Sequence, residues 1–386
     1  MVPHLPQELI EAIVEEVPSE SLAACSLTAI AFVACSQRRL FRWMSLSDIP
    51  AYERAARLLA SSPHLGPYFR YLDLDLKEVP QDYCHLESIL AGLSEIEFLA
   101  ISGDYDGYDR SSSNQIGDQP SLIDFLSLAT LRCLALFGLV DVPASLVARA
   151  FSLFEEILLS LITIANDEDQ DSESSSSPTA LWHIGVSTDS DESVLAFLLH
   201  PKRIRSLHHL QRLSVVFPPI PDSRQHRFEE LLFTCSENLD SLELELETSP
   251  TYIPTLPVLT RLQLWLDVAL TKTPAELHSI IAATIASTPH LEVLTLAFLD
   301  RDHLRQTWTD RRPEALADLD SAFVDMRDLR EVGFSMRWFY HRPERYAAFT
   351  SFIEACFPRT FAAGLVRFSY QSSASQHPMD IFASIS

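Results

Sequence analysis

The sequence predicts an α/β fold of the solenoid type, in which short parallel strands form the concave side of a sheet and return helices form the convex side. Two observations lead to this prediction: one apolar pattern returns along most of the chain, and helical stretches separate its copies. A third observation, a dense apolar pattern in residues 1–47, predicts short helices before the repeats. Hydrophobic residues make up 47% of the 386 residues, which is enough for a sizeable core.

The first segment is predicted to form three short helices. Apolar residues from Leu9 onward recur at steps of three and four until Pro18, the period of an amphipathic helix, and Pro6 fits its first turn. A second helix carries Leu22, and a third ends near Phe41. About 40 residues enclose too small a core to be stable alone, so we expect a remaining apolar face to bury against the next domain or a partner.

These residues resemble an F-box, the segment that joins substrate receptors to SCF-type cullin-RING ubiquitin ligases. The resemblance covers residues 3–46 and rests on Leu5-Pro6, Glu8-Leu9-Ile10, Cys25-Ser26-Leu27 and Arg38-Arg39-Leu40-Phe41. The alternative is an ordinary helical cap on the solenoid. The resemblance implies seven contacts with a Skp-type adaptor, and through it with the cullin scaffold: Leu5, Pro6, Leu9, Ile10, Ile13, Leu22 and Leu27.

The pattern that returns along the chain is apolar-x-x-apolar-x-apolar, at steps of about 20 to 38 residues for most copies. Because successive side chains of a strand point to opposite faces, the fourth and sixth positions enter the core and their neighbours face outward. The copies begin at Phe69, Ile96, Leu131, Phe154, Leu210, Leu239, Leu259, Leu291, Leu329 and Leu365, with a weaker one around Trp182.

A period in this range is typical of leucine-rich repeats, which we predict over residues 48–370. Helices are expected at 51–61 and 275–287. The asparagine that usually follows the strand is missing, with leucine at 139 and 299, so an irregular curve is expected. A generic leucine-rich α/β packing is the alternative. Together with the F-box, the repeats resemble a large fungal family of F-box proteins.

Two stretches interrupt the repeats and are expected to be mobile surface loops. Residues 103–120 collect Gly, Asp, Ser and Asn without an apolar period, and residues 166–178 are acidic and rich in serine. The second loop is either a phosphate acceptor on its serines or a plain solvated insertion. Residues 371–386 form a polar tail.

Charge and cysteine usage exclude several classes of function. A net charge of -24 disfavours nucleic acid and a bare membrane surface as ligands, because phosphate binding depends on lysine and arginine. No apolar stretch approaches the roughly 20 residues that span a bilayer, and no basic stretch precedes an apolar run as in a secretory signal. The six scattered cysteines are expected to be reduced, in a cytoplasmic or nuclear protein.

No motif for catalysis or metal binding stands out. The phosphate loop G-x-x-x-x-G-K-[ST], the elbow G-x-S-x-G, H-E-x-x-H and C-x-x-C are all missing from the sequence. The adjacent His208 and His209 would point apart and make a poor metal pair. We therefore expect no catalytic residue, no metal, no cofactor and no enzyme activity.

Five residues are predicted to contact a target protein from the outward face of the strands. Trp265 alternates with inward-facing leucines, and an exposed tryptophan near arginines has the composition of an interface hot spot. The alternative is that neighbouring residues cover this tryptophan. Basic islands at 200–212 and 301–312 either receive an acidic or phosphorylated segment or balance nearby carboxylates. The predicted target contacts are Phe137, Arg212, Arg261, Trp265 and Arg367.

These features predict the substrate-recognition subunit of an SCF-type ubiquitin ligase, with an adaptor at residues 5–41 and an unknown target protein on the repeats. Such a subunit performs no bond chemistry; it raises the effective concentration of the target near the ubiquitin-charged enzyme. The alternative is a protein-interaction scaffold or inhibitor that acts without ubiquitin transfer. A scaffold would pack the apolar face of Leu9, Ile10 and Ile13 against its own first repeat.

Overall fold

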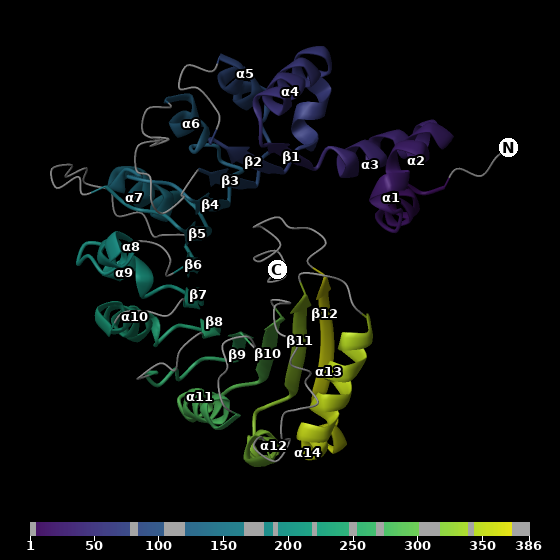
Figure 1. Cartoon of the computed structure of the whole chain (residues 1–386). Helices are drawn as coiled ribbons and strands as arrows, with labels where there is room; N and C mark the ends of the chain where they lie inside the picture. Colours follow the sequence, from purple (N-terminus) through teal and green to yellow (C-terminus); the bar gives the residue numbers. More distant parts are fainter. Residues whose placement is uncertain are drawn as a thin grey trace. The chain divides into compact units, whose positions relative to one another are not determined.

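The computed structural model describes residues 5–77, 84–103, 120–165, 181–187, 192–217, 222–246, 253–267, 274–300, 317–338 and 343–372. It divides into two compact units, Met1–Leu181 and Trp182–Ser386. In both units strands and helices alternate along the chain (Figure 1). The predicted loops at 103–120 and 166–178 lie outside the described residues, except for positions 103 and 120.

The first unit opens with the three predicted helices, α1 (Gln7–Glu15), α2 (Leu22–Thr28) and α3 (Ile30–Leu40). A short 3-10 helix, η1 (Ser19–Ser21), connects the first two. Pro6 precedes α1 as its N-cap, with ψ of 147°, instead of occupying the first turn. The structure thus has three short helices in this segment, and the first ends at Glu15, before Pro18.

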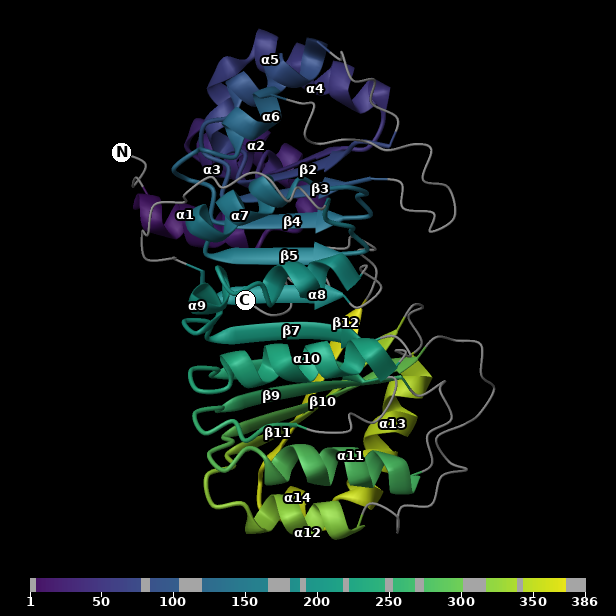
Figure 2. The same cartoon turned by 90° about the vertical axis from the view of Figure 1, so that its left-hand side faces the viewer.

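The strands of the first unit are β1 (Trp43–Leu46), β2 (Tyr71–Asp75), β3 (Phe98–Ser102), β4 (Cys133–Phe137) and β5 (Glu156–Ser160). From β2 onward, each strand pairs in parallel with the strand before it. Figure 2 shows β2 to β5 side by side. Its further helices are α4 (Ile49–Ser61), η2 (Pro63–Tyr68), α5 (Cys84–Gly92), α6 (Pro120–Phe125) and α7 (Ala144–Leu153).

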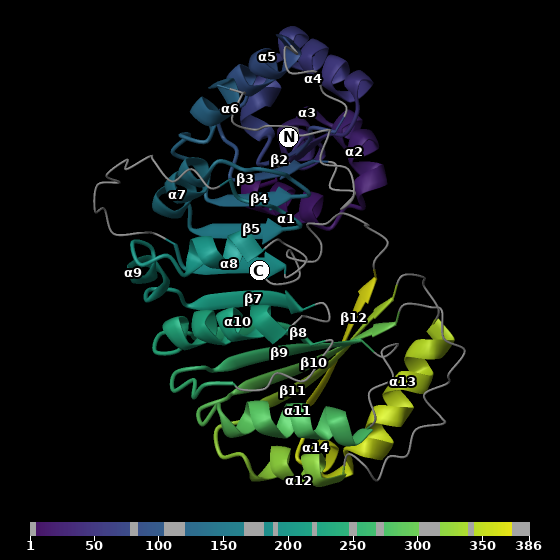
Figure 3. The same ribbon diagram turned by 60° about the vertical axis from the view of Figure 1, so that its left-hand side comes forward.

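The second unit continues the same arrangement (Figure 3). Its parallel strands, again paired in sequence order, are β6 (His183–Ser187), β7 (Arg212–Phe217), β8 (Ser241–Leu246), β9 (Arg261–Asp267), β10 (Val293–Asp300), β11 (Glu331–Trp338) and β12 (Val366–Ser372). The helices are α8 (Glu192–Leu198), α9 (Ile204–Leu207), α10 (Asp222–Cys235), α11 (Pro274–Ala286), α12 (Ala317–Asp325), α13 (Pro343–Cys356) and α14 (Pro358–Ala362).

In each unit one face of the strands is packed against helices, and the repeating apolar residues fill this core. In β2, Leu72 and Leu74 are fully buried, while the alternating residues Tyr71 and Asp73 are half-buried on the opposite face. In the second unit, Phe349 of α13 packs against Phe298 and Phe368 of the sheet, at 5.4 and 6.4 Å between ring centroids. We call the face opposite to the helices the outward face.

Nine strands, β2 to β5 and β7 to β11, begin in the same way, which is direct evidence for a structural repeat. The carbonyl of Arg42 accepts hydrogen bonds from two successive N–H groups, those of Arg70 and Tyr71, at 2.8 and 3.0 Å. The carbonyl of Arg70 does the same for Glu97 and Phe98. The paired bonds recur at the carbonyls of Glu97, Arg132, Trp182, Gln211, Asp240, Thr260 and Glu292.

Every predicted strand is present, and β1 is an additional strand that the prediction missed. Its residues follow the same pattern, Phe41-x-x-Met44-x-Leu46, with Met44 and Leu46 buried. The sheet therefore begins inside the segment 1–47, for which only helices are predicted. The strand β12 similarly reaches residue 372, just inside the predicted tail, whose later residues are not described. The prediction of a solenoid-like α/β fold with parallel strands is confirmed.

Candidate partner-binding surfaces

The three opening helices have a small core of their own. Ile10, Val14, Leu22 and Cys35 are buried together. Two of the seven predicted adaptor contacts, Ile10 and Leu22, are thus 4% and 2% exposed. In this conformation they hold the helices together and support the surface without forming part of it.

Two successive arginines connect α3 to α1. The guanidinium of Arg39 donates hydrogen bonds to the carbonyls of Val14 and Val17, the latter at 2.8 Å, and so satisfies the end of α1. Arg38 lies 3.6 Å from a carboxylate oxygen of Glu11. The arginines of the Arg-Arg-Leu-Phe sequence therefore have a structural role inside the segment.

The other five predicted adaptor contacts are exposed. Leu9 is 52% and Ile13 is 45% exposed, and the two lie on one face of α1 because they are four residues apart. Of the ten exposed large hydrophobic side chains in the part of the chain that the structure describes, seven lie within residues 5–43. Such a concentration of exposed apolar side chains makes this segment a candidate for binding a partner. We call Leu5, Pro6, Leu9, Ile13, Leu27 and Ile30 the helical surface.

A second candidate surface lies on the outward face of the first unit, at the start of its strands. The register places Trp43 beside Tyr71 and Tyr71 beside Phe98. The rings of Trp43 and Tyr71 are stacked, with centroids 5.3 Å apart and planes inclined by 10°, and Phe98 follows at 6.0 Å from Tyr71. These three residues form what we call the aromatic ladder. Trp43, at its outer end, is 37% exposed.

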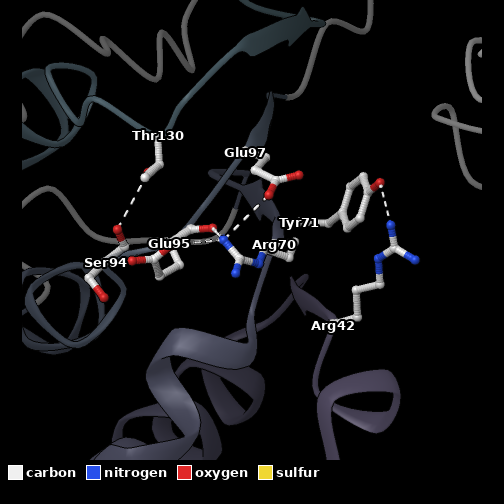
Figure 4. A network of polar contacts seen from close by, with 7 residues as sticks. All are labelled: Arg42, Arg70, Tyr71, Ser94, Glu95, Glu97 and Thr130. Carbon is white, nitrogen blue, oxygen red and sulfur yellow. Dashed lines mark hydrogen bonds and ion pairs between the residues drawn. The ribbon is translucent and has the colours of Figure 1, made fainter. Parts of the chain in front are cut away.

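Two arginines lie beside the aromatic ladder, and both have partners within the chain (Figure 4). Arg42 lies over the ring of Tyr71, 5.2 Å from its centroid, and donates to its hydroxyl at 3.3 Å. Arg70 forms ion pairs with Glu95 at 2.9 Å and with Glu97 at 3.3 Å. The positive charge of Arg70 is therefore balanced by carboxylates of its own chain.

Among the remaining outward positions of β1 to β5, the charged residues are all acidic. Asp73, Asp75 and Glu156 occupy such positions, and no lysine or arginine does. Ser45 donates a hydrogen bond to Asp73 at 3.1 Å. Burial, and then the charge of Glu156, raise the pKa of the Cys133 thiol, which indicates a negative local potential.

Phe137 is the one predicted target contact in the first unit. It lies on the outward face, paired with Ser102 and Ser160, and is half-buried. It ends its strand, whereas the aromatic ladder lies at the start of the strands. The prediction missed Arg42 and Trp43, although the alternation in Phe41-x-x-Met44-x-Leu46 would have identified Trp43 as an outward residue.

In the second unit, the predicted exposure of Trp265 is wrong. Its register is as expected, on the outward face, but the side chain is only 4% exposed and packs with Ala297. Its indole N–H donates to Oε1 of Glu243. Trp265 is therefore covered by neighbouring residues, which is the alternative to an interface role.

Glu243 is the centre of a buried polar network. Besides the indole, Gln263 donates to its Oε1 and Ser214 donates to its Oε2, both at 3.1 Å. Ser214 also lies 3.1 Å from Nε2 of His183. An ionised carboxylate only accepts hydrogen bonds, so all three donors point toward Glu243. Ser214 lies between His183 and Glu243 in this network. A catalytic triad needs the histidine in the middle, so these residues form a structural network.

The three predicted arginine contacts occupy separate places on the outward face of the second unit. Arg212 and Arg261 lie in one row, meaning residues that are paired across neighbouring strands. Ser241 of β8 is paired with both and lies between them, so the backbones of the two arginines are about 10 Å apart. Arg212 is half-buried and Arg261 is exposed. Arg367 lies in another row beside Gly333, also exposed, on the last strand.

Other candidate chemistry contributes little. In the basic island at 200–212, the guanidinium of Arg203 lies 3.4 Å from the ring centroid of Phe197, and burial lowers its pKa. The island at 301–312 lies outside the described residues.

Within the described residues, no group of three or more His, Cys, Asp or Glu side chains is placed to hold a metal ion. None of the helices among those same residues has the length and apolar character needed to cross a membrane.

The strongest candidates are therefore two surfaces of the first unit, the helical surface and the aromatic ladder. Both present apolar side chains to solvent, and neither contains a reactive group. Comparison of the sequence with protein-family models gave no match, and comparison with curated proteins revealed no relative.

Proposed function

We propose that the protein is a substrate receptor of an SCF-type ubiquitin ligase, in which the helical surface binds a Skp-type adaptor and the repeat units bind a target protein. The observation that supports this most is the exposure of Leu9 and Ile13 on α1. A protein whose opening helices served only as a cap would pack this face against its own first repeat.

The arrangement of the first unit is suited to this role. Phe41, at the end of α3, packs against Phe69 at the start of the next repeat, with ring centroids 5.9 Å apart. The helical segment and the sheet are thus joined by packed side chains and not by a free linker. A fixed connection lets the receptor hold its target at a defined distance from the adaptor, which is the basis of effective concentration.

Co-purification of the full chain with a Skp-type adaptor tests this proposal. The double variant Leu9→Asp, Ile13→Asp changes only exposed side chains, so we expect it to abolish the complex and to leave the circular dichroism spectrum unchanged. Leu153→Asp is the matched control, because Leu153 is 43% exposed on α7, outside the helical surface. It should bind as the unchanged chain does.

Two results would contradict the proposal. The first is that the unchanged chain binds no adaptor, and the second is that the control variant loses binding as completely as the double variant. In either case the opening helices would be a cap, and a scaffold or inhibitor that acts without ubiquitin transfer would be the better explanation.

A further inference from the structure

We propose that the outward face of the first unit binds an arginine-rich, extended segment of a partner protein, with the aromatic ladder as its central contact. The inference rests on the proposed function only in identifying this partner as the target. Binding itself requires no adaptor and can be measured on the chain alone.

The ring faces of the ladder are suited to cations. The face of an aromatic ring carries negative potential and attracts guanidinium groups, most strongly when the ring is that of tryptophan. The guanidinium of Arg42 already lies 5.2 Å from the ring centroid of Tyr71, so the chain itself forms this contact at one residue of the aromatic ladder. Trp43 is the most exposed residue of the aromatic ladder, and its ring offers the strongest site for a guanidinium group.

The charges on the same face favour the same partner. Asp73 and Asp75 follow Tyr71 at alternate positions of β2, so both lie on the outward face close to the ladder. Glu156 occupies the same row as the ladder, two strands beyond Phe98. With Arg70 paired to Glu95 and Glu97, a basic partner meets net negative charge here, and an acidic or phosphorylated partner would be repelled.

The side-chain arrangement also favours an extended segment. Alternate residues of a strand are about 7 Å apart, so an extended peptide can place one guanidinium on the rings and the next near the carboxylates. Arginine satisfies both requirements, because its planar group stacks on aromatic rings and pairs with carboxylates.

Fluorescence anisotropy with the full chain tests this inference. The probe is a fluorescein-labelled peptide of alternating arginine and serine, and the matched neutral probe has citrulline at each arginine. We expect the arginine peptide to bind about tenfold more tightly than the citrulline peptide. Trp43→Ala, and separately the double variant Asp73→Asn, Asp75→Asn, should each weaken its binding about tenfold.

Because the chain is strongly acidic, a charge-matched control is essential. The double variant Glu53→Gln, Glu87→Gln removes the same charge from exposed positions on α4 and α5 and should change the affinity by less than about twofold. If Trp43→Ala does not fold, the asparagine variant decides, since asparagine has the shape of aspartate. Equal weakening by both double variants, or equal binding of both peptides, overturns the inference. Failure of adaptor binding alone overturns only the proposed function.

Discussion

The indole N–H of Trp265 donates a hydrogen bond to a carboxylate oxygen of Glu243 on the neighbouring strand. Both side chains are on the outward face of the second unit, yet both are buried. Trp265, which is predicted to bind a target, is therefore part of the core. Substitutions at either residue should change the free energy of unfolding.

Replacing Trp265 is therefore expected to destabilise the protein strongly. Trp265→Ala removes a buried ring and should lower the free energy of unfolding by about 4 kcal/mol. Phe233→Ala, at an aromatic residue that is 67% exposed on α10, should cost less than about 1 kcal/mol. Urea unfolding of both variants checks this. Similar losses for the two would show that Trp265 is not a core residue.

Glu243→Gln tests the network around the carboxylate. An amide presents one oxygen and an N–H₂ group where the donors of Ser214, Gln263 and Trp265 converge. Either one of these donors loses its acceptor, or the Ser214 hydroxyl must change from donor to acceptor, and the hydrogen bonds to a charged group are lost. We expect a loss of about 2 kcal/mol in the free energy of unfolding. Glu237→Gln, at an exposed position just after α10, is the control and should change it little. An unchanged stability of Glu243→Gln would contradict the network.

Much of the fold is predictable from local sequence. The apolar-x-x-apolar-x-apolar pattern gives each strand and the face that packs against the helices together, because successive side chains of a strand point to opposite faces. The weak copy near Trp182 corresponds to β6, although all five residues of that strand are buried. The strand β1 was missed because Phe41 ends a helical pattern and begins a strand pattern at the same residue.

The surfaces were less predictable, because exposure depends on residues far apart in the sequence. The helical period places Leu9 and Ile13 on one face, but it does not show that Ile10 would meet Leu22 and Cys35 from other helices. The strand register likewise gave the face of Trp265 correctly, but not its burial against Glu243 and Ala297, which come from neighbouring strands.

Asp320 is expected to be important for the end of the second unit. This buried carboxylate on α12 accepts the N–H groups of Arg359 and Thr360 at 2.9 and 2.8 Å, at the start of α14. Asp320→Ala leaves these buried donors without an acceptor and should cost about 3 kcal/mol of unfolding free energy. Asp318→Ala, at an exposed position on the same helix, should cost less than about 1 kcal/mol. Thermal unfolding of the two variants distinguishes the roles, and equal shifts in Tm would contradict this one.

Alkaline pH should destabilise the protein in part through Cys235. Burial raises the pKa of this thiol from 9.0 to about 12, so the folded state keeps a proton that the unfolded state releases. The stability that this thiol contributes is present below about pH 9 and is lost as the pH rises towards 12. The difference in unfolding free energy between the unchanged chain and Cys235→Ala should therefore fall by about 1.4 kcal/mol per pH unit above pH 9. A difference that stays constant from pH 8 to 10.5 would contradict this.

Gly66 should tolerate no side chain, because η2 approaches the end of α5 too closely. A Cβ atom at this position would lie 2.1 Å from the carbonyl oxygen of Gly92, and backbone atoms cannot move aside as a flexible side chain would. We expect Gly66→Ala to lower the unfolding free energy by about 3 kcal/mol. Gly364→Ala is the informative comparison, since nothing lies within 4 Å of its Cβ position and only its φ of 72° opposes the change. That backbone conformation costs an alanine about 1 kcal/mol, so urea unfolding should rank Gly66→Ala as clearly the less stable. The reverse order would mean that the contact between η2 and α5 is looser than the structure describes.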